Sequence, residues 1–179
     1  CDVTDAVSCR AAIAAAAKEF GGIDALVYAP AIGHLGRLVD VDADAWRRSF
    51  DTNVVGAALV TAAAIPHLTA SGGRAVYLSS ISASVTAPWP GLGAYAVSKA
   101  ALNKLVEAWR AEHPKVGFTR VTVGECGGGD GAAQSQFANG WDQDLAVEVM
   151  PTWIDRHYMT GLLIDVEERP VPAGDVPTE

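Results

Sequence analysis

Residues 79–99 read Ser-Ser-Ile-Ser-Ala-Ser-Val-Thr-Ala-Pro-Trp-Pro-Gly-Leu-Gly-Ala-Tyr-Ala-Val-Ser-Lys, and this stretch decides how the whole chain is interpreted. Tyr95 and Lys99 are four residues apart, so a helix places the phenol and the ammonium on one face, one turn from each other. A neighbouring cation favours the phenolate and lowers the pKa of a tyrosine, which makes Tyr95 a candidate proton donor and acceptor. The same spacing is common on half-buried helices. The catalytic interpretation therefore rests on the surrounding motifs.

Short apolar runs alternate with longer helical patterns along the chain. Three runs are predicted to be buried strands: residues 25–28, 74–79 and 118–123. Three segments are predicted to be helices: 5–20, capped by Thr4 or Asp5 and ended by Gly21; 42–68, with room for a bend; and 94–112. This alternation predicts an α/β fold with a parallel sheet. Ligands bind such sheets beyond the carboxyl ends of the strands, where the segments after Tyr28, Ser80 and Val123 meet.

Composition and charge argue against several classes of partner. The chain has 179 residues, a formal net charge of −8 and no basic patch, which argues against a nucleic-acid or anionic-membrane partner. Its longest apolar runs, 11–17 and 56–65, are too short to span a bilayer. The cysteines and histidines are scattered and form no metal-ligand pattern, so we expect no metal and free thiols in a reducing cytoplasm.

The order of four motifs resembles the short-chain dehydrogenase/reductase (SDR) family over residues 2–123. The motifs are Asp2-Val3-Thr4, Asn53-Val54-Val55-Gly56, Gly73-Arg74-Ala75-Val76-Tyr77-Leu78-Ser79-Ser80 and the segment from Pro90 through Tyr95 and Lys99 to Leu102. The resemblance implies a doubly wound, Rossmann-like parallel sheet. It also implies an oxidoreductase that transfers hydride between NAD or NADP and a small-molecule alcohol or carbonyl substrate.

The resemblance assigns a role to each of four side chains. Tyr95 would be the general acid/base, and Lys99 would lower its pKa and hold the nicotinamide ribose. Asn53 would keep a water in line for a proton relay, although a helix-interior amide that bonds a neighbouring backbone group is the alternative. A serine would hydrogen-bond the substrate oxygen. Its place at the strand end favours Ser80 and its distance to the tyrosine favours Ser82; we prefer Ser80, because insertions collect in loops.

Cofactor contacts are expected near the start of the chain and after the first predicted strand. Asp2, with Val3 beside it, would reach the adenine amino group, although Asp2 is equally well explained as a solvated turn residue before Thr4. Ala29 and Pro30 would line the adenosine ribose, where the family has Asn-Asn-Ala-Gly. The family's glycine-rich turn is missing, its Pro-Gly after the sixth strand is replaced by Glu125-Cys126, and the C-terminal region is unfamiliar.

These departures lead us to expect an incomplete domain. Residues 1–166 form a partial SDR domain that begins where the family's third strand ends, and the proline-rich residues 167–179 form a disordered tail. We expect a fragment of a longer protein, since its first strand would otherwise leave an open edge.

A homodimer or homotetramer is implied by the family. The alternative function is a degenerate, non-catalytic binding or assembly module. Three tryptophans, Trp89, Trp141 and Trp153, border the substrate pocket or belong to the core.

Overall fold

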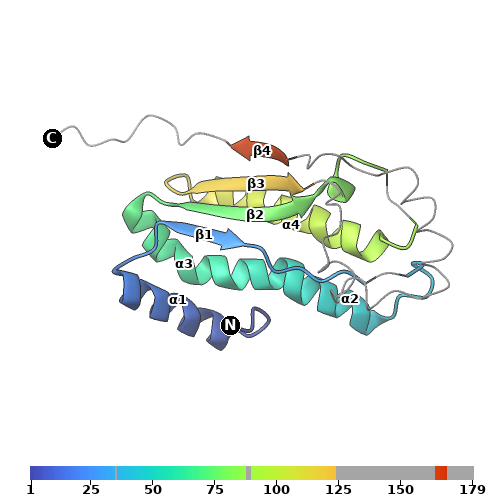
Figure 1. The fold of residues 1–179 in the computed structure, drawn as a ribbon, viewed down its shortest axis with the longest axis horizontal. Helices are drawn as coiled ribbons and strands as arrows, with labels where there is room; N and C mark the ends of the chain where they lie inside the picture. Colours follow the sequence, from blue (N-terminus) through green and yellow to red (C-terminus); the bar gives the residue numbers. More distant parts are fainter. Residues whose placement is uncertain (35, 88–89, 124–163, 169–179) are drawn as a thin grey trace, which may run out of the picture.

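The computed structural model describes residues 1–34, 36–87, 90–123 and the strand at 164–168. A short β-sheet forms one layer and helices form the other (Figure 1). In chain order, the elements are α1 (Ala6–Phe20), β1 (Ala25–Tyr28), α2 (Ala43–Phe50), a π-helical segment (Asp51–Gly56), α3 (Ala57–Ser71), β2 (Arg74–Ser80), a 3₁₀ turn (Ile81–Ala83), α4 (Gly93–Glu112), β3 (Gly117–Val123) and β4 (Ile164–Glu168).

The sheet has the strand order β1-β2-β3-β4. The first three strands are parallel, with Val27 opposite Val76 and Val76 opposite Thr119. The predicted α/β class with a parallel sheet is therefore confirmed for this part. β4 pairs antiparallel with β3, with Val166 opposite Val121, which sets it apart from the other three strands.

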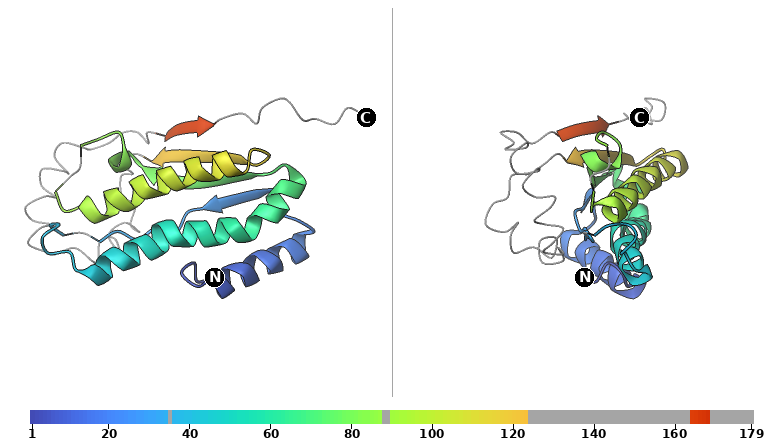
Figure 2. Two further views of the ribbon diagram at one scale, coloured as in Figure 1. Left: turned by 180° about the vertical axis from the view of Figure 1, so that it is seen from behind. Right: turned by 90° about the vertical axis from the view of Figure 1, so that its right-hand side faces the viewer.

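The helices α1, α3 and α4 lie on one face of the sheet (Figure 2). Connections between parallel strands are right-handed. When successive strands are added in one direction across the sheet, the helices of these connections therefore all lie on the same face. Here the chain advances from β1 through β2 to β3, so α3 and α4 share a face. A second helical layer, which a doubly wound sheet carries on its other face, is not found among the described residues.

The core lies between β2 and the helices. Side chains alternate along β2, so that Ala75, Tyr77 and Ser79 are buried against the helical layer. The Tyr77 hydroxyl lies 2.7 Å from Thr61 Oγ1 on α3, and its ring stacks on Phe118 of β3. Burial raises the pKa of Tyr77 to about 12. This phenol is therefore a structural hydrogen-bonding group.

The long helical segment is continuous from Ala43 to Ser71 and contains the π-helical segment, which changes the hydrogen-bond pattern in its middle. Gly56 is required there, because a Cβ at this position would lie 2.6 Å from the Tyr28 hydroxyl. By length and composition the 29 residues could cross a membrane, and core helices satisfy the same criterion. In this fold the helix packs against α1, β1 and β2, which explains its apolar composition.

The predicted boundaries are close to those observed. Asp5 caps α1 by accepting hydrogen bonds from the amides of Val7 and Ser8, and Gly21 ends the helix with a φ of 78°. One boundary needs correction: β4 includes Glu167 and Glu168, which we assigned to the tail. These two residues pair with β3, with Glu167 opposite Arg120 and Glu168 opposite Thr119. The remaining tail, the glycine-rich segment 124–140, the predicted helix 141–158 and the three tryptophans above lie outside the described residues.

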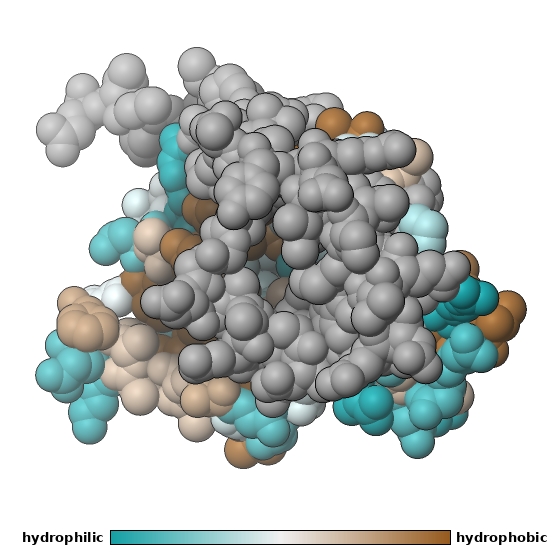
Figure 3. All heavy atoms as spheres, turned by 45° about the vertical axis from the view of Figure 1, so that its right-hand side comes forward, coloured by the Kyte–Doolittle hydropathy of each residue, from teal (hydrophilic) through white to brown (hydrophobic). Residues whose placement is uncertain are grey.

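Exposed apolar side chains are scattered among hydrophilic ones, as the face in Figure 3 illustrates. Single exposed apolar residues are ordinary on a protein surface and by themselves indicate no binding site. The large ones are Val7, Phe20, Val27, Leu38, Val39, Val55, Val85 and Val97.

Gly73 gives a direct test of the junction between α3 and β2. Its amide donates to Leu68 O at 2.8 Å, and a Cβ on Gly73 would overlap the backbone oxygen of Asp24. We expect Gly73→Ala to lower the free energy of unfolding by about 1–3 kcal/mol, measured by urea denaturation. Gly22→Ala is the matched control, because its Cβ would meet nothing within 4 Å. Equal stability of the two variants would contradict this packing.

Candidate active site

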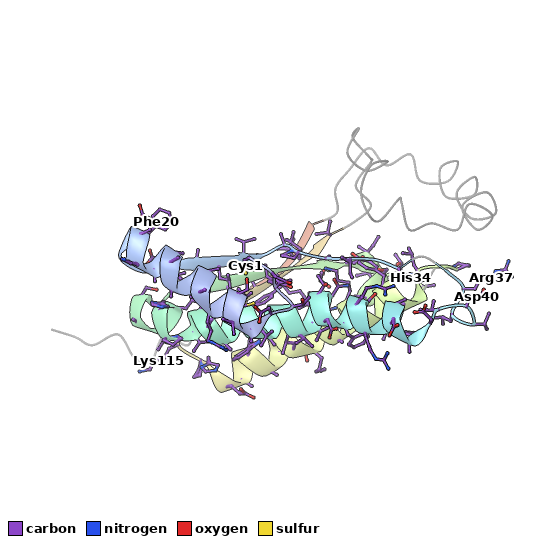
Figure 4. The ribbon with its side chains drawn as sticks, turned by 90° about the horizontal axis from the view of Figure 1, so that it is seen from below. Cys1, Phe20, His34, Arg37, Asp40 and Lys115 are labelled. Carbon is purple, nitrogen blue, oxygen red and sulfur yellow. The ribbon has the colours of Figure 1, made fainter. Side chains whose placement is uncertain are left out.

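The loops that follow β1 and β2 lie at one end of the molecule. Figure 4 shows His34, Arg37 and Asp40 at this end, and Phe20 and Lys115 at the opposite end. The two loops contact each other and the start of α4. The amide of Gly36 donates to Gly91 O at 2.9 Å, and a Cβ on Gly93 would lie 2.6 Å from the Leu38 side chain. The start of the helix that carries Tyr95 is therefore held by the loop after β1.

Lys99 is buried at the contact between α4 and β2. Its side chain is only 3% exposed, its Nζ donates to Leu78 O at 2.7 Å, and the same Nζ lies 5.7 Å from the centre of the Tyr95 ring. Burial lowers the pKa of Lys99 to about 8, because leaving water disfavours the charged form. The structure thus brings the phenol ring and the amine together, as the four-residue spacing predicted.

A second polar contact attaches α4 to β2. Ser79 Oγ donates to Asn103 Oδ1 at 2.5 Å, and both side chains are buried. Asn103 lies one turn beyond Lys99, so Tyr95, Lys99 and Asn103 form one stripe on the helix. Asn103 was not among the predicted site residues, although its spacing of four residues from Lys99 was a signal for it. Because Ser79 is buried and donates its hydroxyl hydrogen to Asn103, that hydrogen is not available to a substrate.

Ser80 ends β2, and its side chain points to the other side of the strand from Ser79. Ser80 Oγ lies 2.8 Å from Ser82 Oγ and accepts a hydrogen bond from the Ser82 amide at 3.2 Å. Ser82 is buried in the 3₁₀ turn, whereas Ser80 is partly exposed. The two serines that the sequence left as alternatives are therefore direct partners.

Asn53 is fully buried in the π-helical segment and joins two other elements. Its side chain accepts from Ile32 N at 2.9 Å, donates to Ile32 O at 2.8 Å and donates to Ser98 Oγ at 2.8 Å. Ser98 in turn donates to the Tyr95 carbonyl at 2.7 Å. Asn53 therefore holds the loop after β1 and the first turns of α4 in one arrangement. The proton relay predicted for this residue stays a prediction.

The expected cofactor residues lie in exposed segments. Asp2 Oδ1 accepts from Thr4 N at 2.9 Å and from Thr4 Oγ1 at 2.8 Å, and these hydrogen bonds lower the pKa of Asp2. Val3 is part of the same turn, and its carbonyl accepts a hydrogen bond from Cys9 Sγ. The turn role proposed as the alternative for Asp2 is thus observed. A second role, toward adenine, stays a prediction.

Ala29 and Pro30 follow β1 directly and are exposed, and the ribose contact expected of them stays a prediction. The preceding Tyr28 is buried instead, and its hydroxyl donates to Thr52 O at 2.5 Å. Burial raises the pKa of Tyr28. Tyr28 is therefore a structural residue that joins β1 to the π-helical segment. Within the described part of the chain, no group of three His, Cys, Asp or Glu side chains could hold a metal ion.

Comparison with known proteins gives consistent matches over most of the chain. The dehydrogenase/reductase SDR family member 4 of Bos taurus is 37% identical over 108 residues, which is 60% of this chain and 38% of that protein. The 11-beta-hydroxysteroid dehydrogenase A of Sesamum indicum is 37% identical over 125 residues, 69% of this chain and 35% of that protein. This chain therefore spans well under half the length of these relatives.

Solved structures match the fold over a similar range. The NADH-dependent reductase A1-R' complexed with NAD has a TM-score of 0.64 and 30% identity, and covers 69% of this chain and 54% of that one. The ligand-free aldohexose dehydrogenase of Thermoplasma acidophilum has a TM-score of 0.69 and 26% identity, with 86% and 60% covered. The fold is thus the Rossmann-like α/β fold of these enzymes. A family model described as "short chain dehydrogenase" matches residues 1–140, and the chain belongs to this family.

Proposed function

We propose that the protein is an oxidoreductase that uses Tyr95 and Lys99 to move a proton while hydride passes between NAD or NADP and an alcohol or carbonyl carbon. The observation that supports this most strongly is the position of the Lys99 amine, buried on Leu78 O and beside the Tyr95 ring. A buried cation next to a phenol favours its phenolate form, which general acid–base chemistry at an oxygen requires.

The proposed roles divide the reaction between neighbouring side chains. In alcohol oxidation, Tyr95 takes the proton of the substrate hydroxyl, and in carbonyl reduction it returns a proton to the oxygen. Ser80 holds that oxygen from the end of β2. The Asn53 side chain fixes the position of the loop after β1 relative to the helical turn that carries Tyr95. Both Nδ2 hydrogens of Asn53 are used, so a relay water would have to bind one of its oxygens.

The residues present fit the ribose end of a dinucleotide cofactor, which when bound supplies or accepts the hydride. An ammonium has three N–H donors, and Leu78 O takes one, so Lys99 has donors suited to ribose hydroxyls. Ala29 and Pro30 offer an exposed backbone at the carboxyl end of β1, although Pro30 contributes no N–H. Asp2 and Val3 would contact the adenine.

The proposal also covers the localisation, the partners and the oligomeric state of the protein. We infer a cytoplasmic enzyme with a small-molecule substrate and with neither a nucleic-acid nor a membrane partner. We also infer a homodimer or homotetramer built on the outer faces of α3 and α4. This oligomeric state rests on the family resemblance, since the exposed Val55 and Val97 are single apolar side chains and indicate no interface by themselves. Light scattering of the purified protein measures the oligomeric state.

A degenerate binding or assembly module is the second candidate. It is favoured by Tyr28, which stands at the first position of the family's Asn-Asn-Ala-Gly segment. The Tyr28 hydroxyl donates a hydrogen bond to Thr52 O. The two functions differ in one measurable property, nicotinamide dinucleotide binding. Calorimetric titration with NADH and NADPH should give a saturable heat for the enzyme. A non-catalytic module would give no heat of binding with NADH or NADPH, and its assembly would not require either cofactor.

The general acid/base role of Tyr95 is tested by Tyr95→Phe. We expect carbonyl reduction to fall by about 10²–10⁴-fold, with cofactor affinity nearly unchanged, because only the phenolic hydroxyl, which carries the exchangeable proton, is removed. The measurement is steady-state NAD(P)H oxidation by the whole protein with a panel of ketones and aldehydes. Tyr77→Phe is the control, since this phenol bonds Thr61 in the core. Tyr95→Phe activity equal to that of the control would contradict the proposal.

The buried Lys99 predicts a pH dependence of stability. Its pKa falls from 10.5 to about 8 on folding, so the unfolded chain binds more protons between these values and stability rises with pH. The full shift corresponds to about 3 kcal/mol. We expect the stability of the wild type, relative to Lys99→Met, to rise by that amount between about pH 7 and about pH 10.5 in urea unfolding. A pH-independent difference would contradict the burial of this amine.

A further inference from the structure

The hydroxyls of Ser80 and Ser82 form one hydrogen-bonded unit at the carboxyl end of β2. Their oxygens are 2.8 Å apart, and the Ser82 amide also donates to Ser80 Oγ at 3.2 Å. The first distance allows either hydroxyl to be the donor. The direction of this one hydrogen bond decides which serine can donate to a third group.

Counting donors and acceptors separates the two directions. A serine hydroxyl has one hydrogen and two lone pairs. If Ser82 donates to Ser80, the Ser80 oxygen accepts twice, from the Ser82 hydroxyl and from the Ser82 amide, and its own hydrogen points elsewhere. If Ser80 donates to Ser82, the Ser80 hydrogen is consumed. The Ser82 hydrogen then has to find a partner of its own.

Burial favours the first direction. Ser82 is only 6% exposed, whereas Ser80 is partly exposed at the strand end. A buried hydroxyl gains most from a hydrogen bond inside the protein, and an accessible hydroxyl can donate to a ligand. The Ser82 amide already approaches Ser80 Oγ as a donor, so the oxygen is arranged as a double acceptor.

We propose that Ser82 is a positioning residue that donates to Ser80 and so leaves the Ser80 hydroxyl hydrogen for the oxygen of the substrate. This proposal rests on the proposed oxidoreductase function. It assigns the two serines different roles, contact for Ser80 and orientation for Ser82. Neither serine transfers a proton in either direction of the reaction. The proton of the alcohol passes to Tyr95, while Ser80 only holds the oxygen.

The direction of the hydrogen bond can be measured without any turnover. Slowly exchanging serine hydroxyls give resolved isotope shifts on their ¹³Cβ resonances in mixed H₂O and D₂O. We expect the Ser82 hydroxyl to exchange slowly and the Ser80 hydroxyl to exchange fast in the 179-residue chain. In Ser80→Ala, exchange at Ser82 should accelerate because its acceptor is gone. A protected Ser80 hydroxyl, or equally fast exchange at both, would overturn the proposed orientation.

The catalytic consequence is tested by a double-mutant cycle in the whole protein. We expect Ser80→Ala to lower kcat by about 10²-fold and Ser82→Ala by about tenfold, with partial rescue in Ser82→Thr. Since Ser82 acts through Ser80, the double variant should be no slower than Ser80→Ala alone. The matched control is Ser84→Ala, an exposed hydroxyl of the same loop, which should leave kcat unchanged.

The two experiments fail in distinguishable ways. A wild-type protein that binds no nicotinamide cofactor and turns over no carbonyl substrate contradicts the proposed function, while the exchange rates still decide the orientation. Additive losses in the cycle, or a larger loss for Ser82→Ala than for Ser80→Ala, contradict the positioning role in an active enzyme. In that case Ser82 would contact the substrate directly.

Discussion

The contact between the buried Lys99 amine and the Leu78 carbonyl is the interaction on which the candidate site depends. It fixes the rotation of α4 against β2, and one turn earlier the same helix presents Tyr95. Burying an amine costs free energy, and a single hydrogen bond to a carbonyl offsets only part of that cost. The same burial lowers the pKa of Lys99, because the charged form is the one that loses hydration. The fold thus places an energetically unfavourable group 5.7 Å from the centre of the Tyr95 ring.

Three further polar contacts keep this arrangement rigid. Asn103 receives a hydrogen bond from Ser79, which prevents α4 from sliding along β2. Asn53 bonds both backbone groups of Ile32 and also Ser98, which connects the π-helical segment to the first turns of α4. All four side chains are buried, so the loss of one partner leaves another unsatisfied group in the core. Rigidity at this end of the sheet therefore follows from polar groups rather than from apolar packing alone.

Local signals predicted most of the fold, and contacts between distant segments explain what was missed. Capping at Asp5, the glycine at position 21 and the apolar runs predicted α1 and the strands closely. The π-helical form at Asn53 has no compositional signature, because it changes hydrogen-bond register without changing the apolar pattern. Likewise, the sequence indicated Ser80 and Ser82 as alternative candidates. It could not predict the hydrogen bond between their hydroxyls, which depends on the backbone conformation after β2.

The most direct test of the account is a trans-hydrogen-bond scalar coupling between ¹⁵Nζ of Lys99 and the ¹³C carbonyl of Leu78, measured by NMR. We expect a resolved coupling and slow exchange of the Nζ protons with water, because the two atoms are 2.7 Å apart in a buried contact. A Lys99 side chain with no such coupling and with rapid proton exchange would place the amine in solvent. That result would contradict the arrangement of the site.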